Sequence, residues 1–308
     1  MSEPIIIGVD HGYAAMKTAH FSFHTGLVAH EHEPYTLSNV LEYGGKFYVV
    51  GSGRQPLQKD KTQAEDYYLL TLAAIAKELE YRNAGTMADV HLATGLPLTS
   101  FGRDKKAFRD YLCRGGKPVS FRYEGQDYVI TISKVSLYPQ GYAAVLTQGS
   151  LLDEPSVIVA DIGGWTVDLM RLDNRIPNAA TCRSLELGMI RCLDEISEQI
   201  RRGLDLSMTA AQIESVLRGD ASHVNEDAKK IIYQEAERYT KRLLSAIAES
   251  GLDVRAMPAV FLGGGAALLK RHVSAADGLC RPVILDDVSL NAKGYEWLTE
   301  RLEQKHEQ

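Results

Sequence analysis

The chain has 308 residues, of which 45% are hydrophobic and 24% charged, with a net charge of −6 and a pI near 5.9. This is the composition of a globular protein with one large domain or two ordinary ones. A mildly acidic chain lacks the basic patch that nucleic-acid phosphates require, so direct nucleic-acid binding is not expected. The four cysteines lack metal-binding spacing and are expected to be free thiols: Cys113, Cys182, Cys192 and Cys280.

The first half of the chain begins with an apolar strand and a turn. Residues 5–9 are apolar and run into Asp10-x-Gly12, which predicts a buried strand and a tight turn, with residues 16–22 returning antiparallel. In this half we predict further strands where apolar residues occupy every second position, and helices where they recur every 3.6 positions. The strands are 35–41, 45–50, 90–94, 119–123 and 128–135, and the helices are 64–82, 101–113 and 142–148.

The same pattern restarts after Pro155. A strand, an Asp161-x-Gly163 turn and a second strand are followed by a strand at 179–187 and helices at 189–202, 209–218 and 226–249. Ser207 or Thr209 is the predicted cap of the middle helix. A strand at 259–262 enters three glycines and a helix to about residue 272, and a last helix covers 294–305. Strands alternate with helices, which predicts an α/β chain with two related halves.

The two Asp-x-Gly turns indicate phosphate binding. Glycine lets backbone N–H groups approach an anion. The aspartate repels phosphate but suits Mg²⁺ held through water, a role that Asp10 and Asp161 would have. Two such turns facing each other would hold a triphosphate from both sides. Lys17, seven residues after Asp10, would bring a cation to the β- or γ-phosphate. A single Asp-x-Gly is a common turn, whereas two copies at matching positions, each after an apolar strand, indicate phosphate binding.

Two other segments suit a nucleotide site. Gly263–Gly265 form a strand-to-helix turn that suits a nucleotide base or phosphate, and the alternative is a turn that only packs the helix. Gln140 stands at the entry to a helix, where an amide orients water but cannot abstract a proton. The alternative for Gln140 is an ordinary polar residue at a helix start.

In this order the segments resemble the actin-like ATPase superfamily. The matching pieces are the first phosphate motif 8–17, a connecting helix 138–144, the second phosphate motif 161–168, a second connecting helix 186–193 and the adenosine motif 262–266. "GLPL", "YPQG" and "NAKGYEWL" resemble the ParM-like plasmid-segregating bacterial actins. The resemblance implies an actin-like fold of two related α/β domains with ribonuclease H-like cores and a nucleotide cleft between them. We expect residues 1–153 plus 287–308 in one domain and 154–286 in the other.

The resemblance also implies a function. It implies hydrolysis of ATP or GTP with Mg²⁺, nucleotide-driven head-to-tail filaments, and an adaptor protein that binds a centromere-like DNA site, so that filaments segregate plasmids. No direct nucleic-acid contact and no membrane partner are expected. No stretch reaches the ~18 apolar residues of a membrane span, and the apolar run at 5–9 is too short for a signal core. We therefore expect a cytoplasmic protein.

The site residues follow from the resemblance. Asp10 and Asp161 would hold the hydrated metal and the attacking water, and Gln140 would position that water. Gly188 would lie where the second connecting helix approaches the first, and Glu214 and Arg218 would approach the base. The full set expected at the nucleotide is Gly12, Tyr13, Ala14, Ala15, Lys17, Gly163, Gly164, Trp165, Thr166, Asp168, Gly188, Glu214, Arg218, Gly263, Gly264 and Gly265.

Three positions depart from the family pattern. Tyr13 follows the first glycine where Ser, Thr or Asn is common, so the backbone must contribute more to phosphate binding and the ring is left to pack or stack. Trp165 stands where small polar residues are usual, next to the hydroxyl of Thr166. Gln140 replaces a Glu found in some relatives.

Two alternatives stay open at this point: a small-molecule kinase, and a chaperone-like or cell-division actin relative. A small-molecule (sugar) kinase of the same superfamily needs a carboxylate base, often in an Asn-Asp pair, and the chain has no such dipeptide. A chaperone-like relative needs a substrate domain for which 308 residues leave no room. A membrane-bound division protein needs an amphipathic anchor, and the segment 294–308 is too highly charged for that role.

Overall fold

The computed structural model describes residues 3–35, 38–53, 60–149 and 154–306. The chain divides into two compact units, Met1–Thr147 with Ser289–Gln308, and Gln148–Val288. The α/β prediction is confirmed in both, because each combines a mixed sheet with helices. The predicted domain boundary after residue 153 borders a segment outside the described residues, and the exact domain bounds stay a prediction.

Unit 1 contains the N-terminal elements and the last helix of the chain. Its strands are β1 Ile5–His11, β2 Ala15–Thr18, β3 Ser22–His24, β4 Leu27–His30, β5 Val40–Tyr43, β6 Lys46–Val50, β7 Met87–Leu96, β8 Pro118–Tyr123 and β9 Gln126–Pro139. Its helices are α1 Asp66–Tyr81, α2 Leu98–Cys113, the short 3₁₀ helix η1 Arg114–Gly116, α3 Tyr142–Leu146 and α8 Leu290–His306.

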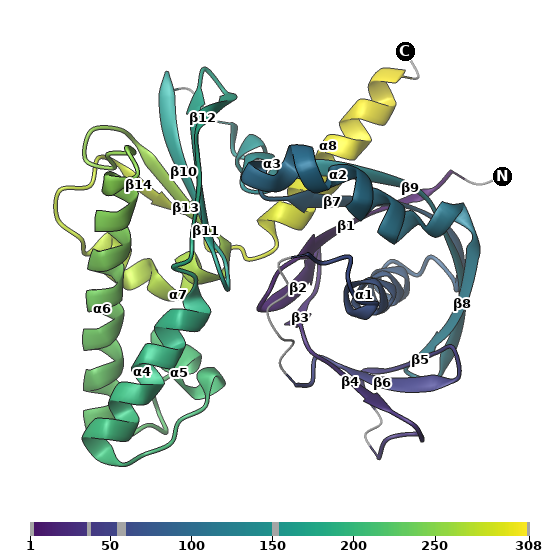
Figure 1. Cartoon of the computed structure of the whole chain (residues 1–308), viewed down its shortest axis with the longest axis horizontal. Helices are drawn as coiled ribbons and strands as arrows, with labels where there is room; N and C mark the ends of the chain where they lie inside the picture. The colour runs from purple at the N-terminus through teal and green to yellow at the C-terminus, as the bar shows by residue number, and fades with distance from the viewer. Residues whose placement is uncertain (1–2, 36–37, 54–59, 150–153, 307–308) are drawn as a thin grey trace. The chain divides into compact units, whose positions relative to one another are not determined.

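The nine strands form one sheet in the order β3-β2-β1-β7-β9-β8-β5-β6-β4. The sheet curls around α1, as Figure 1 shows. This explains why α1 is buried on nearly all faces, from Tyr67 to Leu79, rather than on one apolar stripe. The apolar side chains of α1 and of the surrounding strands make up the core of unit 1.

Unit 2 contains a five-stranded sheet in the order β12-β11-β10-β13-β14. The strands are β10 Ser156–Ile162, β11 Val167–Asp173, β12 Ile176–Leu185, β13 Ala259–Leu262 and β14 Pro282–Ile284. The helices are α4 Met189–Leu204, α5 Ala210–Leu217, α6 Glu226–Glu249 and α7 Gly263–Ser274. The buried faces of these helices and the sheet form the second core.

The helix ends of unit 2 follow local capping chemistry. Thr209 caps α5 through a capping box with Gln212, which decides between the two predicted caps. Asn225 caps α6 by accepting from the N–H groups of Asp227 and Ala228.

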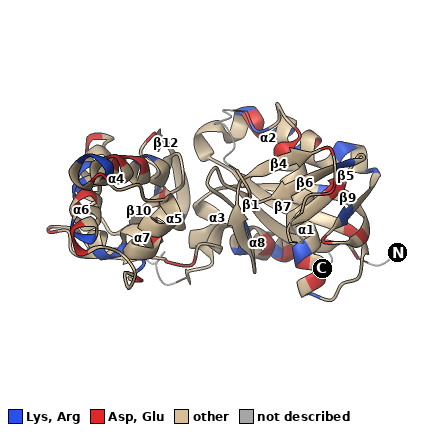
Figure 2. Ribbon diagram, turned by 90° about the horizontal axis from the view of Figure 1, so that it is seen from below, with Lys and Arg blue, Asp and Glu red and all other residues tan. Residues whose placement is uncertain are grey.

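The outward faces of α4 and α6 carry acidic and basic residues close together, as Figure 2 shows, and many of them form ion pairs three or four residues apart.

The two sheets repeat one pairing scheme. β1 pairs antiparallel with β2 and parallel with β7, and β10 pairs antiparallel with β11 and parallel with β13. Asp10 lies opposite Lys17 in the first hairpin, and Asp161 lies opposite Asp168 in the second. The internal repeat that the sequence predicts is therefore present strand for strand.

The structure differs from the predicted elements at a few places. The short strands β3, β4 and β14 were not predicted, because three or four residues give too little periodicity. Of the segment 186–193, expected as a second connecting helix, residues 189–193 begin α4 in unit 2 and residues 186–188 precede it, and its approach to the first connecting helix stays a prediction. The helix that packs on α3 is α8, where Gly294 meets the backbone of Ala143.

Candidate functional site

The first turn is built around the carboxylate of Asp10, at the end of β1. Asp10 is only 3% exposed, so its oxygens need partners inside the protein. Oδ1 accepts a hydrogen bond from Nε2 of Gln140 at 2.9 Å, and Oδ2 lies 3.5 Å from Nζ of Lys17. Strand β2 supplies Lys17 because antiparallel pairing puts it opposite Asp10. Three residues predicted for the site are thus brought together.

Gln140 reaches Asp10 from the end of β9. Its backbone N–H donates to the carbonyl of Leu96, which fixes the position just before α3. Because the side-chain N–H₂ donates to Asp10, the carbonyl oxygen of Gln140 is the end that can accept a hydrogen bond from a water. This geometry suits a residue that orients water, and the amide has no proton-abstracting group.

The backbone of the first turn is tied down on its carbonyl side. The carbonyl of Gly12 accepts from the Thr25 hydroxyl at 2.7 Å, and that of Ala14 accepts from the Thr25 N–H at 3.0 Å. The carbonyl of His11 accepts from the ammonium of Lys61. In a planar trans peptide the next N–H points away from the carbonyl, so the N–H groups of Tyr13 and Ala15 point away from the bonds to Thr25. Such N–H groups are suited to an anion. The N–H of Gly12 already donates to the Asp10 carbonyl at 3.1 Å.

His11 supports the turn from inside the core. Its Nδ1 lies 2.9 Å from the hydroxyl of Thr94 and its Nε2 lies 2.8 Å from that of Thr71. Burial, and secondly the charge of Lys61, lower the pKa of His11 to about 3. The ring is therefore neutral near pH 7 and hydrogen-bonds through both nitrogens.

The second turn presents Asp161, which is 8% exposed at the end of β10. The position opposite is Asp168 rather than a cation. Asp168 accepts from the hydroxyl of Ser184 at 2.5 Å and from that of Thr166 at 3.2 Å. The Thr166 hydroxyl, predicted at the nucleotide, is therefore bonded to Asp168 in this structure.

The second turn rests on the N-terminus of α4. The N–H groups of Met189 and Ile190 donate to the carbonyls of Gly163 and Gly164, and that of Gly188 donates to Trp165. A Cβ at Gly188 would overlap the backbone of Trp165. Gly188 therefore holds the turn against α4, and its expected place where the two connecting helices approach each other stays a prediction.

The three glycines after β13 have different surroundings. Gly263 has a φ of +89°, and a Cβ there would overlap Oδ1 of Asp161, so glycine is required. Gly265 packs against Ile162 and Met189. Gly264 has nothing within 4 Å of its Cβ position. Because β13 lies parallel beside β10, these glycines are held next to Asp161.

Glu214 lies on α5, and Arg218 caps the C-terminal end of that helix. Glu214 pairs with Arg218 at 3.4 Å, one helical turn apart. α5 packs on α4, α6 and α7, so it lies in the same unit as the glycine turn. Their predicted approach to the base stays a prediction.

The donor set of the turns fits a hydrated Mg²⁺. Within residues 3–35, 38–53, 60–149 and 154–306, no three His, Cys, Asp or Glu side chains gather as a metal cluster. Each turn instead offers one buried carboxylate. Mg²⁺ keeps several waters and uses one or two carboxylates together with substrate phosphates, so single carboxylates suit it. None of the described helices combines the length and apolarity needed to cross a membrane.

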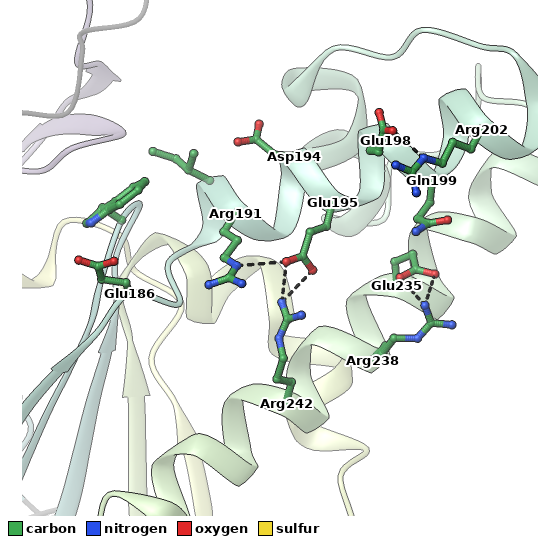
Figure 3. A pocket seen from close by; sticks show the side chains of 12 residues that line it. Glu186, Arg191, Asp194, Glu195, Glu198, Gln199, Arg202, Glu235, Arg238 and Arg242 are labelled. Carbon is green, nitrogen blue, oxygen red and sulfur yellow. Dashed lines mark hydrogen bonds and ion pairs between the residues drawn. The ribbon is translucent and has the colours of Figure 1, made fainter.

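A groove of about 770 Å³ runs between α4 and α6 in unit 2. Figure 3 shows that its charged walls are paired with one another: Glu195 bonds Arg191 and Arg242, and Glu235 bonds Arg238. Of the residues predicted for the nucleotide, Trp165 lines it. Paired surface charges are typical of a solvated face, and apart from Trp165 the lining of the groove comes from outside the two turns.

Sequence reasoning missed three residues of the first turn. His11 occupies the variable position between Asp10 and Gly12, and Thr25 lies ten residues beyond the turn. Lys61 comes from the segment before α1. No local spacing links Lys61 to the turn, so tertiary structure alone reveals it.

Comparisons with known proteins agree with this architecture. Residues 8–142 match the family described as the N-terminal domain of actin-like proteins. Residues 159–275 match the C-terminal domain of the archaeal actin homologue, MreB-like. An archaeal actin homolog of Thermoplasma volcanium is 25% identical over 268 residues, which are 82% of this chain and 81% of that protein.

Three solved structures share the fold. An archaeal actin homolog in complex with ADP has a TM-score of 0.77 at 22% identity, with 96% of this chain and 99% of that chain covered. Bacillus thuringiensis ParM with ATP has 0.68 at 14%, covering 98% and 100%. The Alp12 filament structure has 0.67 at 15%, also covering 98% and 100%.

The chain thus carries domains of the actin-like ATPase family in both halves, and the predicted actin-like fold with two α/β domains is confirmed.

Proposed function

We propose that this chain is a nucleotide-hydrolysing actin-like protein that assembles into dynamic filaments. The observation that carries the proposal is the repeated strand-turn-strand unit, with a buried aspartate at the same register position in both copies. A repeat that keeps a buried carboxylate twice is expected where both copies serve one ligand. Relatives determined with ADP or ATP, and one determined as a filament, add support by analogy.

In this proposal one nucleoside triphosphate is bound by residues of both units. The first turn and Lys17 bind phosphate, the second turn binds phosphate through Gly163 and Gly164, and Gly264 contacts the nucleoside. Mg²⁺, when bound through water to Asp10 and Asp161, supplies positive charge that stabilises the charge developing on the phosphates. ATP and GTP are both candidates, since no base-recognition contact is defined.

The residues of the first turn have distinct tasks in hydrolysis. Asp10 and Lys17 fix each other, and Asp10 in turn holds the amide of Gln140. The carbonyl oxygen of Gln140 is then oriented to accept a hydrogen bond from the attacking water, which lines the water up with the γ-phosphorus. The proton is not taken up by Gln140, which acts by positioning.

We further propose that hydrolysis controls assembly and that the filaments segregate DNA through a DNA-binding adaptor protein. A head-to-tail contact that does not close on itself produces a filament, and a nucleotide that favours one conformation of the subunit regulates that contact. The acidic net charge of the chain favours an adaptor over direct DNA contact.

The test is right-angle light scattering of the purified protein with Mg²⁺ and either ATP or GTP, followed by pelleting. The proposal predicts a rise that requires nucleotide, has a critical concentration and decays as phosphate is released. A flat trace with both nucleotides over a range of protein concentrations contradicts filament assembly. In that case, phosphorylation of sugars is the next activity to measure.

A further inference from the structure

Lys61 is a buried lysine whose ammonium lies at the first turn. It is 9% exposed and donates to the carbonyl of His11, between Asp10 and Gly12. The same ammonium lies 5.0 Å from the ring centre of Tyr13 and 5.3 Å from that of Tyr67. Aromatic faces attract cations and hold them in place, so this positive charge is fixed rather than mobile.

The position of this charge matters because the turn lacks polar side chains. Tyr13-Ala14-Ala15 offers no short hydroxyl or amide to a phosphate. The attraction for an anion must come from backbone N–H groups and nearby cations. Lys17 lies 3.5 Å from the carboxylate of Asp10, which offsets part of its charge. Lys61 adds a second positive charge on the other side of the turn backbone.

The environment of Lys61 strengthens its electrostatic effect. The side chain is surrounded by protein, where charges interact more strongly than in water. The hydrogen bond to the His11 carbonyl also fixes that peptide, whose N–H belongs to Gly12 and donates to the Asp10 carbonyl at 3.1 Å, so the start of the turn is held from both ends of one peptide.

We propose that Lys61 is a positioning residue for the polyphosphate of the nucleotide. It holds the backbone from His11 to Tyr13 in the anion-binding form and supplies positive charge, in place of the short hydroxyl or amide side chain that position 13 lacks. The proposal rests on the proposed function, since it requires that the first turn binds a nucleoside triphosphate.

The experiment measures dissociation constants of ATP, ADP and AMP with Mg²⁺ by calorimetry, with the guanine series in parallel, for wild type and three variants. For Lys61→Met we expect ATP binding to weaken about tenfold or more, equal to about 1.4 kcal/mol, with a smaller loss for ADP and little for AMP. Lys61→Gln keeps a donor for the His11 carbonyl and is expected to show the same graded loss. Lys61→Arg keeps the charge and should stay within about threefold of wild type.

Lys77→Met is the matched control. Lys77 also faces two rings, at 5.8 Å from Phe21 and 5.4 Å from Tyr123, but it lies on α1 and has no contact with the turn backbone among the bonds of the described residues. Its loss should leave all the affinities unchanged.

Several results would overturn the proposal. One is ATP affinity like wild type in both Lys61→Met and Lys61→Gln. Another is an equal loss for ATP and AMP, which indicates a general structural role without charge dependence. The affinity of wild type is measured first. If wild type binds no nucleotide, the proposed function is wrong, and the role of Lys61 in binding a polyphosphate is wrong as well.

Discussion

The two Asp-x-Gly turns have the same register but different support. In the first, Lys17 faces Asp10, and the carbonyls are held by Thr25 and Lys61. In the second, Asp168 faces Asp161, and the turn rests on backbone N–H groups of α4. The repeat has preserved the strand-turn-strand frame and the buried carboxylate, while the residue opposite has changed sign. We infer that the first turn contributes cations and the second contributes a fixed backbone geometry.

The largest expected effect comes from removing either carboxylate. Asp10→Ala and Asp161→Ala should each lower the hydrolysis rate by on the order of 10³-fold or more, because each removes a buried negative charge that would hold the hydrated metal. Phosphate release under saturating nucleotide measures the effect. If one variant hydrolyses normally, the two turns do not act together.

Gln140→Ala should have the next largest effect, about 10²-fold slower hydrolysis, while assembly still occurs and filaments last longer. The reason is that the variant removes the water-orienting carbonyl and leaves the phosphate-binding backbone unchanged. Light scattering and phosphate release, followed on one sample, test this. Hydrolysis at the wild-type rate would show that Gln140 does not position the water.

The glycines that follow β13, beside Asp161, allow a comparison between two neighbouring positions. Gly263→Ala should lower the free energy of unfolding by about 2 kcal/mol, because it combines a positive φ with an overlap on Asp161. Gly264→Ala enters open space and should not lower stability in the absence of nucleotide. Denaturant titration of both variants without nucleotide checks the difference. An equal loss of stability in both variants would mean that the contact with Asp161 is not the reason why position 263 requires glycine.

The smallest expected effect is a pH dependence specific to the first turn. The folded pKa of His11 is lowered to about 3 from the ordinary 6.5, so the unfolded chain binds more protons between these values. The stabilisation that the neutral ring gives to the folded state is therefore present at pH values above 6.5 and is lost progressively as the pH falls from 6.5 toward 3. At pH 5.5 the loss is about 1.4 kcal/mol.

The His11→Asn variant isolates this contribution. Denaturant titrations at pH 7.5 and 5.5 should show a smaller fall in stability for the variant than for wild type, by about 1.4 kcal/mol. The same pH dependence in both proteins would assign the effect to other groups.

Much of the fold can be predicted because local signals agree with the tertiary structure. The helix at 226–249 is predicted with both ends correct, because its apolar residues recur with a helical period along this whole segment. α1 is predicted as a helix, but its burial on all faces depends on the curled sheet, which no local pattern encodes. Strands of three residues such as β3 are too short to detect.

The site divides in the same way. Asp10 and Asp161 are found because a repeated motif is visible in the sequence, and Gln140 because it opens a helix after a strand. The tasks of Gly188 and Lys61 arise from contacts between distant segments: Gly188 packs on Trp165, and Lys61 reaches His11 across fifty residues. Such contacts leave no spacing signal in one sequence.

The central claim is that both turns serve one nucleotide. The most direct test is calorimetric titration of wild type, Asp10→Ala and Asp161→Ala with a non-hydrolysable triphosphate and Mg²⁺. The account predicts one nucleotide per chain for wild type and weakened binding in both variants. Two nucleotides per chain, or full affinity in either variant, would contradict it.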